Sequence, residues 1–252
     1  MFRIPIITYH SIDDSGSVIS TAPSIFKRQI AALAEAGFDA LTLRELVSRM
    51  DKGVPLPAKP VVLTFDDGFK NFYTEAYPEL NAHGFAATVF LVTDQCGRFN
   101  DWAGNPKDFP RSELLSWKEI RELSVAGVEF GSHTRTHPDL LSISASSLEN
   151  EIAGSKSSLE DKLGVETVSF AYPFGRKDDR VKRIAAANFK AATSTVLGKV
   201  TPQSDLYALE RVDAYYLSNP WILDRLDTAG FDRYLSFRQF LRNTKSLVAR
   251  AH

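Results

Sequence analysis

The sequence lacks the features that define several specialised protein classes. Its only cysteine, Cys96, has no partner for an internal disulfide, which fits a reducing compartment without excluding an oxidising one. No run approaches the roughly 20 apolar residues of a membrane-spanning helix. The opening MFRIPIITYH is also too short for the apolar core of a signal peptide. We therefore expect the chain as written in the cytoplasm, or exported if a signal peptide has been removed from it.

A charge excess is missing too. Thirty Lys and Arg against 31 Asp and Glu leave a net charge of −1, which gives no electrostatic reason to expect nucleic acid or an anionic membrane as a partner. Nor does any Gly/Ser-rich linker or shift in composition divide the 252 residues. A chain of this length buries roughly 70–75% of its unfolded surface, which is enough for one core. We expect a single domain over residues 1–252, with a helical tail from about residue 230.

What the sequence does contain is a repeated alternation of helix and strand. An amphipathic segment, a Gly or Asn and an apolar run recur as LAEAGFDALTL, LNAHGFAATVFLV, LSVAGVEFGSH and AAANFKAATS. Gly37, Gly84, Gly127 and Asn188 stand where a helix ends in a left-handed residue. The apolar runs lack polar alternation, as parallel strands covered on both faces do. This pattern predicts an α/β fold, either a barrel or an open doubly wound sheet.

Two adjacent acids end one of these apolar runs. In VVLTFDDGF, Asp66 and Asp67 would point to opposite faces if the strand continued, and one would enter a helix-covered layer where an unpaired charge is costly. The strand is therefore expected to stop there, with Gly68 allowing the turn and both carboxylates at the C-terminal mouth of the sheet. A turn with two solvated acids is the alternative interpretation.

Two histidines end another apolar run. VEFGSHTRTHPDL places His133 and His137 with three residues between them, a spacing that lets two imidazoles bind one ion. A pair on a helix surface or in a loop cap is the alternative, although the preceding strand and Pro138 favour a loop at the sheet mouth. Two imidazoles with one carboxylate form a typical divalent-metal set, which favours zinc, while cobalt, nickel and iron share such ligands. A cation also explains the paired acids, because one can be a ligand while the other acts as a base.

A long polar loop at residues 94–116 interrupts the alternation. It follows a strand, so it is expected on the C-terminal face, where parallel sheets bind ligands. Loops of this length are often binding elements, and this one carries Phe99, Trp102 and Phe109.

The motifs TFDDG, SHTRTHP and FAYPFG, in this order, resemble those of the polysaccharide deacetylases of the NodB-homology type, carbohydrate esterase family 4. The resemblance extends from about residue 4 to about residue 213. It implies a distorted (β/α) barrel with about seven strands. It also implies a metal-dependent hydrolase that removes N-acetyl groups from N-acetylhexosamine residues of a polysaccharide, a glycolipid or a glycan precursor.

This resemblance assigns roles by position. It implies metal ligands at Asp67, His133 and His137, a catalytic base at Asp66 and an oxyanion donor at the backbone N–H of Phe174. The expected substrate contacts are a platform of the loop aromatics Phe99, Trp102 and Phe109, together with Tyr172 and Tyr215.

The chain departs from the family pattern at two positions. The third motif usually has an Arg two residues before its Pro, where this chain has Ala171, so Arg211 in LERVDAY is the candidate that holds Asp66. The late histidine motif is missing. The opening PIITYHSI resembles the subgroup of exopolysaccharide N-deacetylases in which that histidine lies on the first strand, which makes His10 the expected proton donor. A first-strand histidine with a backbone partner is the alternative interpretation.

Three other functions remain open on these residues. The same metal site would serve an O-acetyl esterase or a non-sugar amidohydrolase, which acetate release from both kinds of substrate would separate. A non-catalytic carbohydrate-binding relative is the third alternative. Such a protein would keep the metal ligands but would not need a catalytic base, so the presence of Asp66 argues against this alternative.

Overall fold

The computed structural model describes residues 2–105, 109–218, 220–223 and 225–250. Within these residues, parallel strands form the main sheet: β1 (Ile6–Tyr9), β4 (Asp39–Leu41), β5 (Pro60–Phe65), β6 (Thr88–Leu91), β7 (Glu129–Ser132), β8 (Ser169–Ala171), β9 (Ala191–Leu197) and β10 (Leu209–Asp213). The spatial order is β1-β10-β9-β8-β7-β6-β5, and β1 also pairs with β5, so seven strands close into a barrel. Strand β4 pairs with the first residues of β5. The expected distorted barrel with about seven strands is confirmed.

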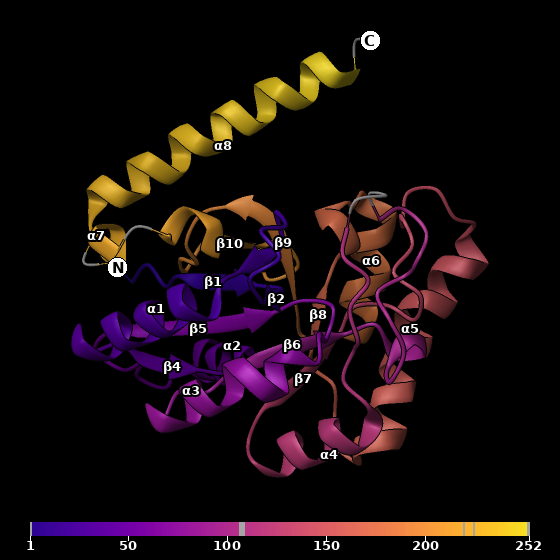
Figure 1. Ribbon diagram of the computed structural model, residues 1–252. Helices are drawn as coiled ribbons and strands as arrows, with labels where there is room; N and C mark the ends of the chain where they lie inside the picture. The colour runs from indigo at the N-terminus through magenta and orange to yellow at the C-terminus, as the bar shows by residue number, and fades with distance from the viewer. Residues whose placement is uncertain (1, 106–108, 219, 224, 251–252) are drawn as a thin grey trace.

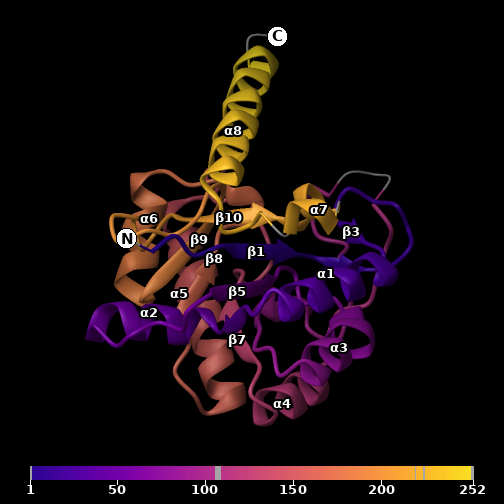
Figure 2. The same cartoon turned by 90° about the vertical axis from the view of Figure 1, so that its left-hand side faces the viewer.

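Helices occupy the connections and surround the barrel (Figures 1 and 2). Between the strands lie α1 (Pro23–Glu35), α2 (Leu43–Lys52), α3 (Tyr77–Ala82), α4 (Trp117–Val125), α5 (Ala145–Leu163) and α6 (Asp179–Asn188). After β10 follow α7 (Pro220–Leu223) and α8 (Ala229–Arg250). Two short strands, β2 (Ser11–Ile12) and β3 (Ser20–Thr21), pair with each other beyond β1. Because the barrel strands are parallel, their C-terminal ends all lie at one rim.

Left-handed residues end three of the helices as the sequence indicates. Gly37, Gly84 and Gly127 have φ values of 75°, 66° and 96°. The same prediction was wrong for Asn188, which is the last residue of α6, and Phe189 after it is already extended at φ −123°. Phe189 buries its ring at once in the core, so this connection turns without a left-handed residue.

The pairing of β1 with β5 aligns the first half of the site. Tyr9 lies opposite Phe65 in register, so His10 and Asp66 leave the barrel side by side. The Asp66 N–H donates to the Tyr9 carbonyl at 2.9 Å. Below them Tyr9 and Phe65 stack with 5.1 Å between ring centres, and Phe26 packs edge-on against both rings. This buried aromatic cluster gives the two strand ends a rigid base.

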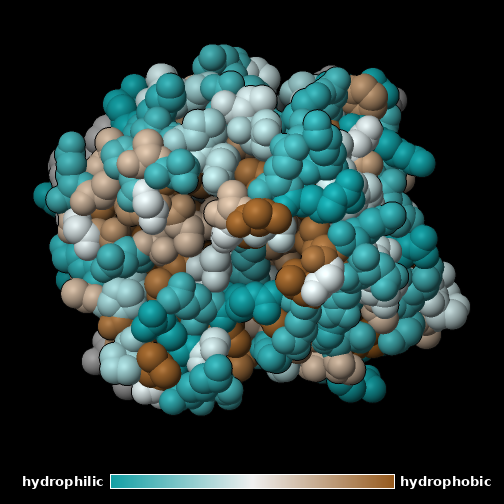
Figure 3. All heavy atoms as spheres, turned by 90° about the horizontal axis from the view of Figure 1, so that it is seen from below, coloured by the Kyte–Doolittle hydropathy of each residue, from teal (hydrophilic) through white to brown (hydrophobic). Residues whose placement is uncertain are grey.

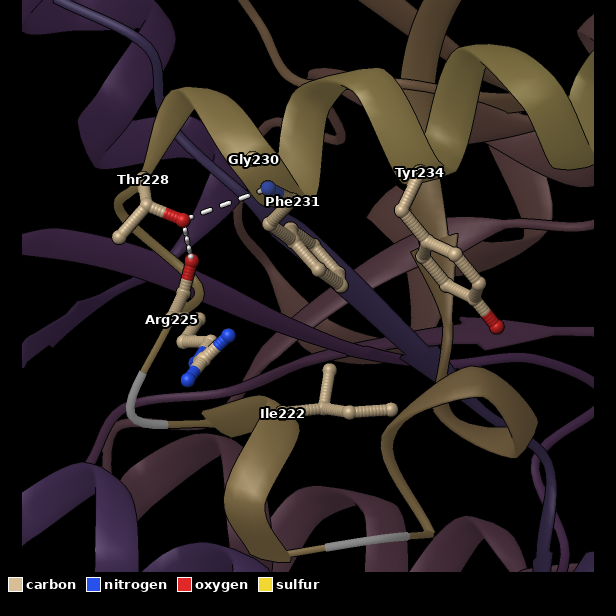
Figure 4. Close-up of a pocket in the computed structure, with 6 residues that line it drawn as sticks. All are labelled: Ile222, Arg225, Thr228, Gly230, Phe231 and Tyr234. Carbon is tan, nitrogen blue, oxygen red and sulfur yellow. Dashed lines mark hydrogen bonds between the residues drawn. The ribbon is translucent and has the colours of Figure 1, made fainter.

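The helical tail expected from about residue 230 is α8, and its first turn is fixed to the barrel. Asp232 pairs with Lys199 at 2.6 Å and with Arg3 at 3.0 Å. Thr228 caps the helix by accepting the Phe231 N–H at 3.3 Å (Figure 4). A cavity of about 240 Å³ lies between α7 and this first turn. From there the helix rises away from the barrel (Figures 1 and 2).

The face shown in Figure 3 carries no broad apolar area. Hydrophilic residues cover most of it, and apolar residues appear as small separate groups. On α8, Phe237, Phe240 and Leu241 are exposed. Over the part of the chain that the structure describes, no helix has the length and apolar character that crossing a membrane requires.

Candidate functional site

The residues singled out in the sequence meet at the rim formed by the C-terminal strand ends. His10 follows β1, Asp66 and Asp67 follow β5, His133 and His137 follow β7, and Arg211 reaches them from β10. The two aspartates and the two metal-binding candidates among the histidines are buried. Barrel closure thus brings together side chains that are far apart along the chain.

Asp67, His133 and His137 direct one ligand atom each at the same small volume. Asp67 Oδ1 lies 3.5 Å from the Nε2 atoms of both histidines, and these two nitrogens are 3.2 Å apart. Ligand atoms about 2.1 Å from one tetrahedral ion lie roughly 3.4 Å from each other, so the three side chains fit a divalent metal. Asp67 Oδ1 has no hydrogen-bond donor among the described residues, as expected for an atom whose partner is an ion.

A backbone contact fixes the ring of His133. Its Nδ1 lies 2.8 Å from the Ala171 carbonyl, to which the Nδ1–H donates. This leaves the lone pair on Nε2, the atom that faces Asp67 and His137. Metal-binding histidines are commonly oriented by such a bond on the far ring nitrogen. Ala171, where the family usually has an Arg, therefore contributes through its backbone.

Backbone strain is concentrated at this site. Among the described residues other than glycine, positive φ values occur at Asp67, Thr134, His137 and Phe174, at 71°, 70°, 59° and 56°. Residues with side chains adopt this conformation at an energetic cost, and such strain gathers at functional sites. Gly68 has a φ of 75°, and a Cβ there would lie 2.6 Å from a methyl carbon of β6. The turn after β5 therefore requires glycine at position 68 next to a strained Asp67.

Arg211 holds Asp66 through two parallel hydrogen bonds. Its Nη1 and Nη2 atoms each donate to one carboxylate oxygen of Asp66 at 2.7 Å, and its Nε donates to the Ser194 carbonyl at 2.9 Å. Burial alone would raise the pKa of Asp66, but the charge and hydrogen bonds of Arg211 outweigh it and hold that pKa well below its usual range. Arg211 thus supplies the guanidinium that Ala171 does not, and Asp66 stays ionised.

Asp67 responds to the same burial in the opposite direction. Burial raises the pKa of Asp67, and the charge of Asp66 beside it acts in the same sense. Burial, together with the neighbouring His133, lowers the pKa of His137 and keeps its imidazole neutral. Metals bind neutral imidazole, and a divalent ion restores the carboxylate form of a buried acid. Both shifts therefore fit a metal-binding role.

His10 lies on the open side of Asp66. Its Nε2 is 3.9 Å from Asp66 Oδ2, and its side chain is 28% exposed against 4% for Asp66. A cavity of about 50 Å³ beside it is lined by residues at the ends of β1 and β10, including Thr8, Asp213 and Tyr215. Tyr215 itself is 67% exposed. Both side chains are therefore open to solvent.

The aromatic platform expected in the long loop is wrong for Trp102. This side chain is only 7% exposed, and its ring packs on His137 with 4.6 Å between ring centres. Phe99 is covered by the Arg111 guanidinium, 3.3 Å from the ring centre. Phe109 is half-buried beside residues 106–108, which lie outside the described residues. Trp102 thus packs inward against His137, and the described part of the loop offers no row of open rings.

The third motif is divided between the core and the site. Tyr172 is 1% exposed and its hydroxyl donates to the Tyr207 carbonyl at 3.0 Å, so its expected role as a substrate contact is wrong. Two residues later, Phe174 is 41% exposed and its ring meets that of His137 with 4.6 Å between centres. Phe174 therefore lies at the metal triad, where the oxyanion donor is expected.

One buried acid at the site was not predicted from the sequence. Glu151, on α5, accepts the N–H groups of Arg135 and Thr136 at 2.9 Å through Oε2 and the Thr136 hydroxyl at 2.7 Å through Oε1. These donors belong to the turn between His133 and His137. Glu151 lies on α5, the helix that follows this turn, and an acid on an amphipathic helix gives no sequence signal that it folds back onto the turn.

Comparison with known proteins assigns the chain to a family. The family model described as polysaccharide deacetylase matches residues 53–192, more than half of the chain, so this protein belongs to the polysaccharide deacetylase family. The resemblance drawn from the three motifs is thereby confirmed. A poly-β-1,6-N-acetyl-D-glucosamine N-deacetylase of Staphylococcus aureus (strain MSSA476) is 29% identical over 203 residues, which cover 77% of this chain and 67% of that protein.

Two further relatives differ in how much of their length is matched. The protein of the same description in Escherichia coli (strain K12) is 30% identical over 141 residues, which cover 51% of this chain but only 20% of that protein. Among solved structures, the Streptococcus pyogenes deacetylase PplD in complex with acetate has a TM-score of 0.74 and 29% identity. That match covers 84% of this chain and 92% of PplD.

Proposed function

We propose that this protein is a metal-dependent carbohydrate N-deacetylase that removes N-acetyl groups from N-acetylhexosamine residues of a polysaccharide, a glycolipid or a glycan precursor. The observation that supports this most directly is an ionised Asp66, held by Arg211, next to three convergent metal ligands. The S. aureus and E. coli relatives are named as deacetylases of poly-β-1,6-N-acetyl-D-glucosamine, which makes that polymer the first substrate to test.

Asp67, His133 and His137 would hold the metal. Two imidazoles and one carboxylate favour zinc over magnesium or calcium, and cobalt, nickel and iron share this preference. When bound by these residues, a divalent ion would supply Lewis acidity to the acetyl carbonyl and to water. The backbone N–H of Phe174 is suited to donate to the carbonyl oxygen as it gains negative charge, and one such donor is worth about 3–4 kcal/mol.

Asp66 is the proposed base and His10 the proposed acid. Arg211 fixes both oxygens of Asp66 and keeps the carboxylate unprotonated, ready to take the proton of the attacking water. An amine leaves only when it is protonated, so amide hydrolysis needs a donor within reach of the leaving nitrogen. The partial exposure of His10, whose Nε2 lies 3.9 Å from Asp66 Oδ2, supports it as the donor to the leaving nitrogen. An activated ester needs no such donor.

The proposed function is tested by measuring acetate release. The zinc-loaded protein is incubated with β-1,6-linked N-acetylglucosamine oligomers and, in parallel, with O-acetylated sugars. Release from the N-acetylated oligomers that is abolished by chelation and by Asp66→Asn supports the proposal. Release from the O-acetyl esters alone would replace it with the esterase, and sugar binding without any release would indicate a binding protein.

A further inference from the structure

We propose that Trp102 and Glu151 are positioning residues of the metal centre: Trp102 sets the ring of His137, and Glu151 sets the backbone that carries it. This inference rests on the proposed metal site and goes beyond it. It gives the long loop at residues 94–116 a role in metal binding where a role in sugar binding is expected from its sequence.

The two histidine ligands are supported in different ways. His133 donates from Nδ1 to a backbone carbonyl, but Nδ1 of His137 has no hydrogen-bond partner among the described residues. The ring of His137 instead packs against two aromatic rings. Trp102 and Phe174 each have 4.6 Å between their ring centre and that of His137, at interplanar angles of 34° and 74°. Ring packing therefore takes the place of the usual outer hydrogen bond.

Trp102 is itself held in place by apolar packing and by hydrogen bonds within its loop. It belongs to a small apolar cluster with Phe69, Val92 and Leu114. The loop is closed by Asn100, which is 3% exposed, donates to the Pro110 carbonyl at 3.1 Å and accepts the Ser112 N–H at 2.7 Å. The buried Trp102 Nε1 has no acceptor among the described residues, so within this part of the chain it is packing that orients the ring. Such a fixed ring is suited to hold a neighbouring imidazole in one orientation.

Glu151 acts on the backbone of the turn between the two histidines. It takes three hydrogen bonds from Arg135 and Thr136, and the next residue is His137, whose own N–H donates to Thr134 Oγ1 at 3.0 Å. Thr134 and His137 both have positive φ, a conformation that the chain keeps only where surrounding contacts enforce it. A carboxylate that pairs both N–H groups between these positions supplies such contacts.

The test measures Co²⁺ affinity of the metal-free full-length protein by titration, followed through the visible absorption of the bound ion. Trp102→Leu and Glu151→Ala should each bind Co²⁺ about 10- to 100-fold more weakly than the wild type, the usual effect of losing an outer support. Trp102→Phe keeps a ring against His137 and Glu151→Gln keeps an acceptor for the backbone, so both should stay within a few-fold of wild type. The matched controls are Phe99→Leu, in the same loop, and Glu149→Ala, exposed on the same helix.

Urea unfolding of each metal-free variant separates positioning from stability. Weaker Co²⁺ binding with an altered absorption spectrum in a fully folded variant, restored by the conservative change, supports the inference. Wild-type affinity in Trp102→Leu and Glu151→Ala would overturn it, as would an affinity loss equal to the unfolded fraction. If the wild type itself bound no Co²⁺, the proposed metal centre would be wrong, and the inference that rests on it would be wrong too.

Discussion

Replacement of Arg211 by Met should destabilise the protein and disable its proposed base together. The change removes the guanidinium but keeps a side chain of similar length in the barrel. Asp66 then remains in the same buried position without the cation that holds its charge. Burying an unpaired carboxylate is one of the costliest single changes in a protein interior.

The size of the effect follows from the geometry of the pair. The two hydrogen bonds measure 2.7 Å each, and the side chains of Arg211 and Asp66 are only 2% and 4% exposed, so water screens the interaction little. Removing one partner of such a pair costs about 3–5 kcal/mol. For a domain of this size 1 kcal/mol lowers Tm by roughly 2–4 °C, so Tm should fall by about 6–20 °C.

The destabilisation should also depend on pH. In the wild type the pKa of Asp66 is depressed, so its contribution to stability is complete above a pH of about 4 and is lost as the pH falls through the depressed value. In Arg211→Met the effect of Arg211 is lost, and burial, the largest cause at this site, raises the pKa of Asp66 against the smaller effects of His133 and His10. The folded variant therefore takes up a proton as the pH falls, and the buried charge disappears. The stability gap between the two proteins should be widest near pH 8 and narrow toward pH 4.

Urea unfolding of the metal-free proteins, followed by tryptophan fluorescence, measures this gap. The double variant Asp66→Asn/Arg211→Met is the control, because a neutral amide needs no cation. It should recover much of the lost stability without recovering acetate release. A loss below about 1 kcal/mol at pH 8, or a double variant no more stable than Arg211→Met, would refute the reasoning.

Three further outcomes are expected. Asp66→Asn should keep Co²⁺ affinity within a few-fold of wild type yet lose most acetate release. Near-normal turnover in this variant would show that Asp66 is not the base. His10→Ala should slow N-acetyl hydrolysis far more than hydrolysis of a nitrophenyl acetate, whose leaving group departs unprotonated; equal losses on both would move the acid elsewhere. Burial lowers the pKa of His137 in the folded chain. Below a pH of about 6.5 this histidine is therefore protonated in the unfolded chain but still neutral in the folded chain, so the metal-free protein should lose stability as the pH falls below that value. His137→Asn should flatten that slope in urea unfolding, and an unchanged slope would contradict the assignment.

The parts of the site that the sequence predicts are those fixed by short stretches of chain. Asp66, Asp67, His133 and His137 each follow an apolar run, and the rule that parallel strands end at one rim brings them together. Arg211 was a candidate only because the motif Arg was missing. Its contact with Asp66 depends on the closure of β10 onto β1 and β1 onto β5, which residue patterns do not show.

The errors fall where a side chain has two plausible environments. Trp102 in a polar loop is compatible with an open platform or an inward anchor, and only the folding of the loop onto His137 decides between them. Tyr172 directly follows β8, and its side chain is buried in the core, while Phe174 two residues later is exposed at the site. The sequence does not show at which of these positions the chain leaves the core. Asn188 was assigned a left-handed conformation by analogy with glycine, but the following residue reached the core without it.

The conformation of Asp67 explains how two adjacent carboxylates are tolerated in one buried turn. In a continuing strand the two acids would point to opposite faces, and one would enter the helix-covered layer without a partner. The positive φ of Asp67 instead turns its carboxylate toward His133 and His137, while Asp66 faces Arg211. Each acid then faces a different partner, and the two pKa values shift in opposite directions although both groups are buried. Since the guanidinium of Arg211 is bound to Asp66, an ionised Asp67 needs a second cation, and the Nε2 atoms of His133 and His137 beside it suit a metal ion. Backbone strain at a single residue thus separates the base from the ligand.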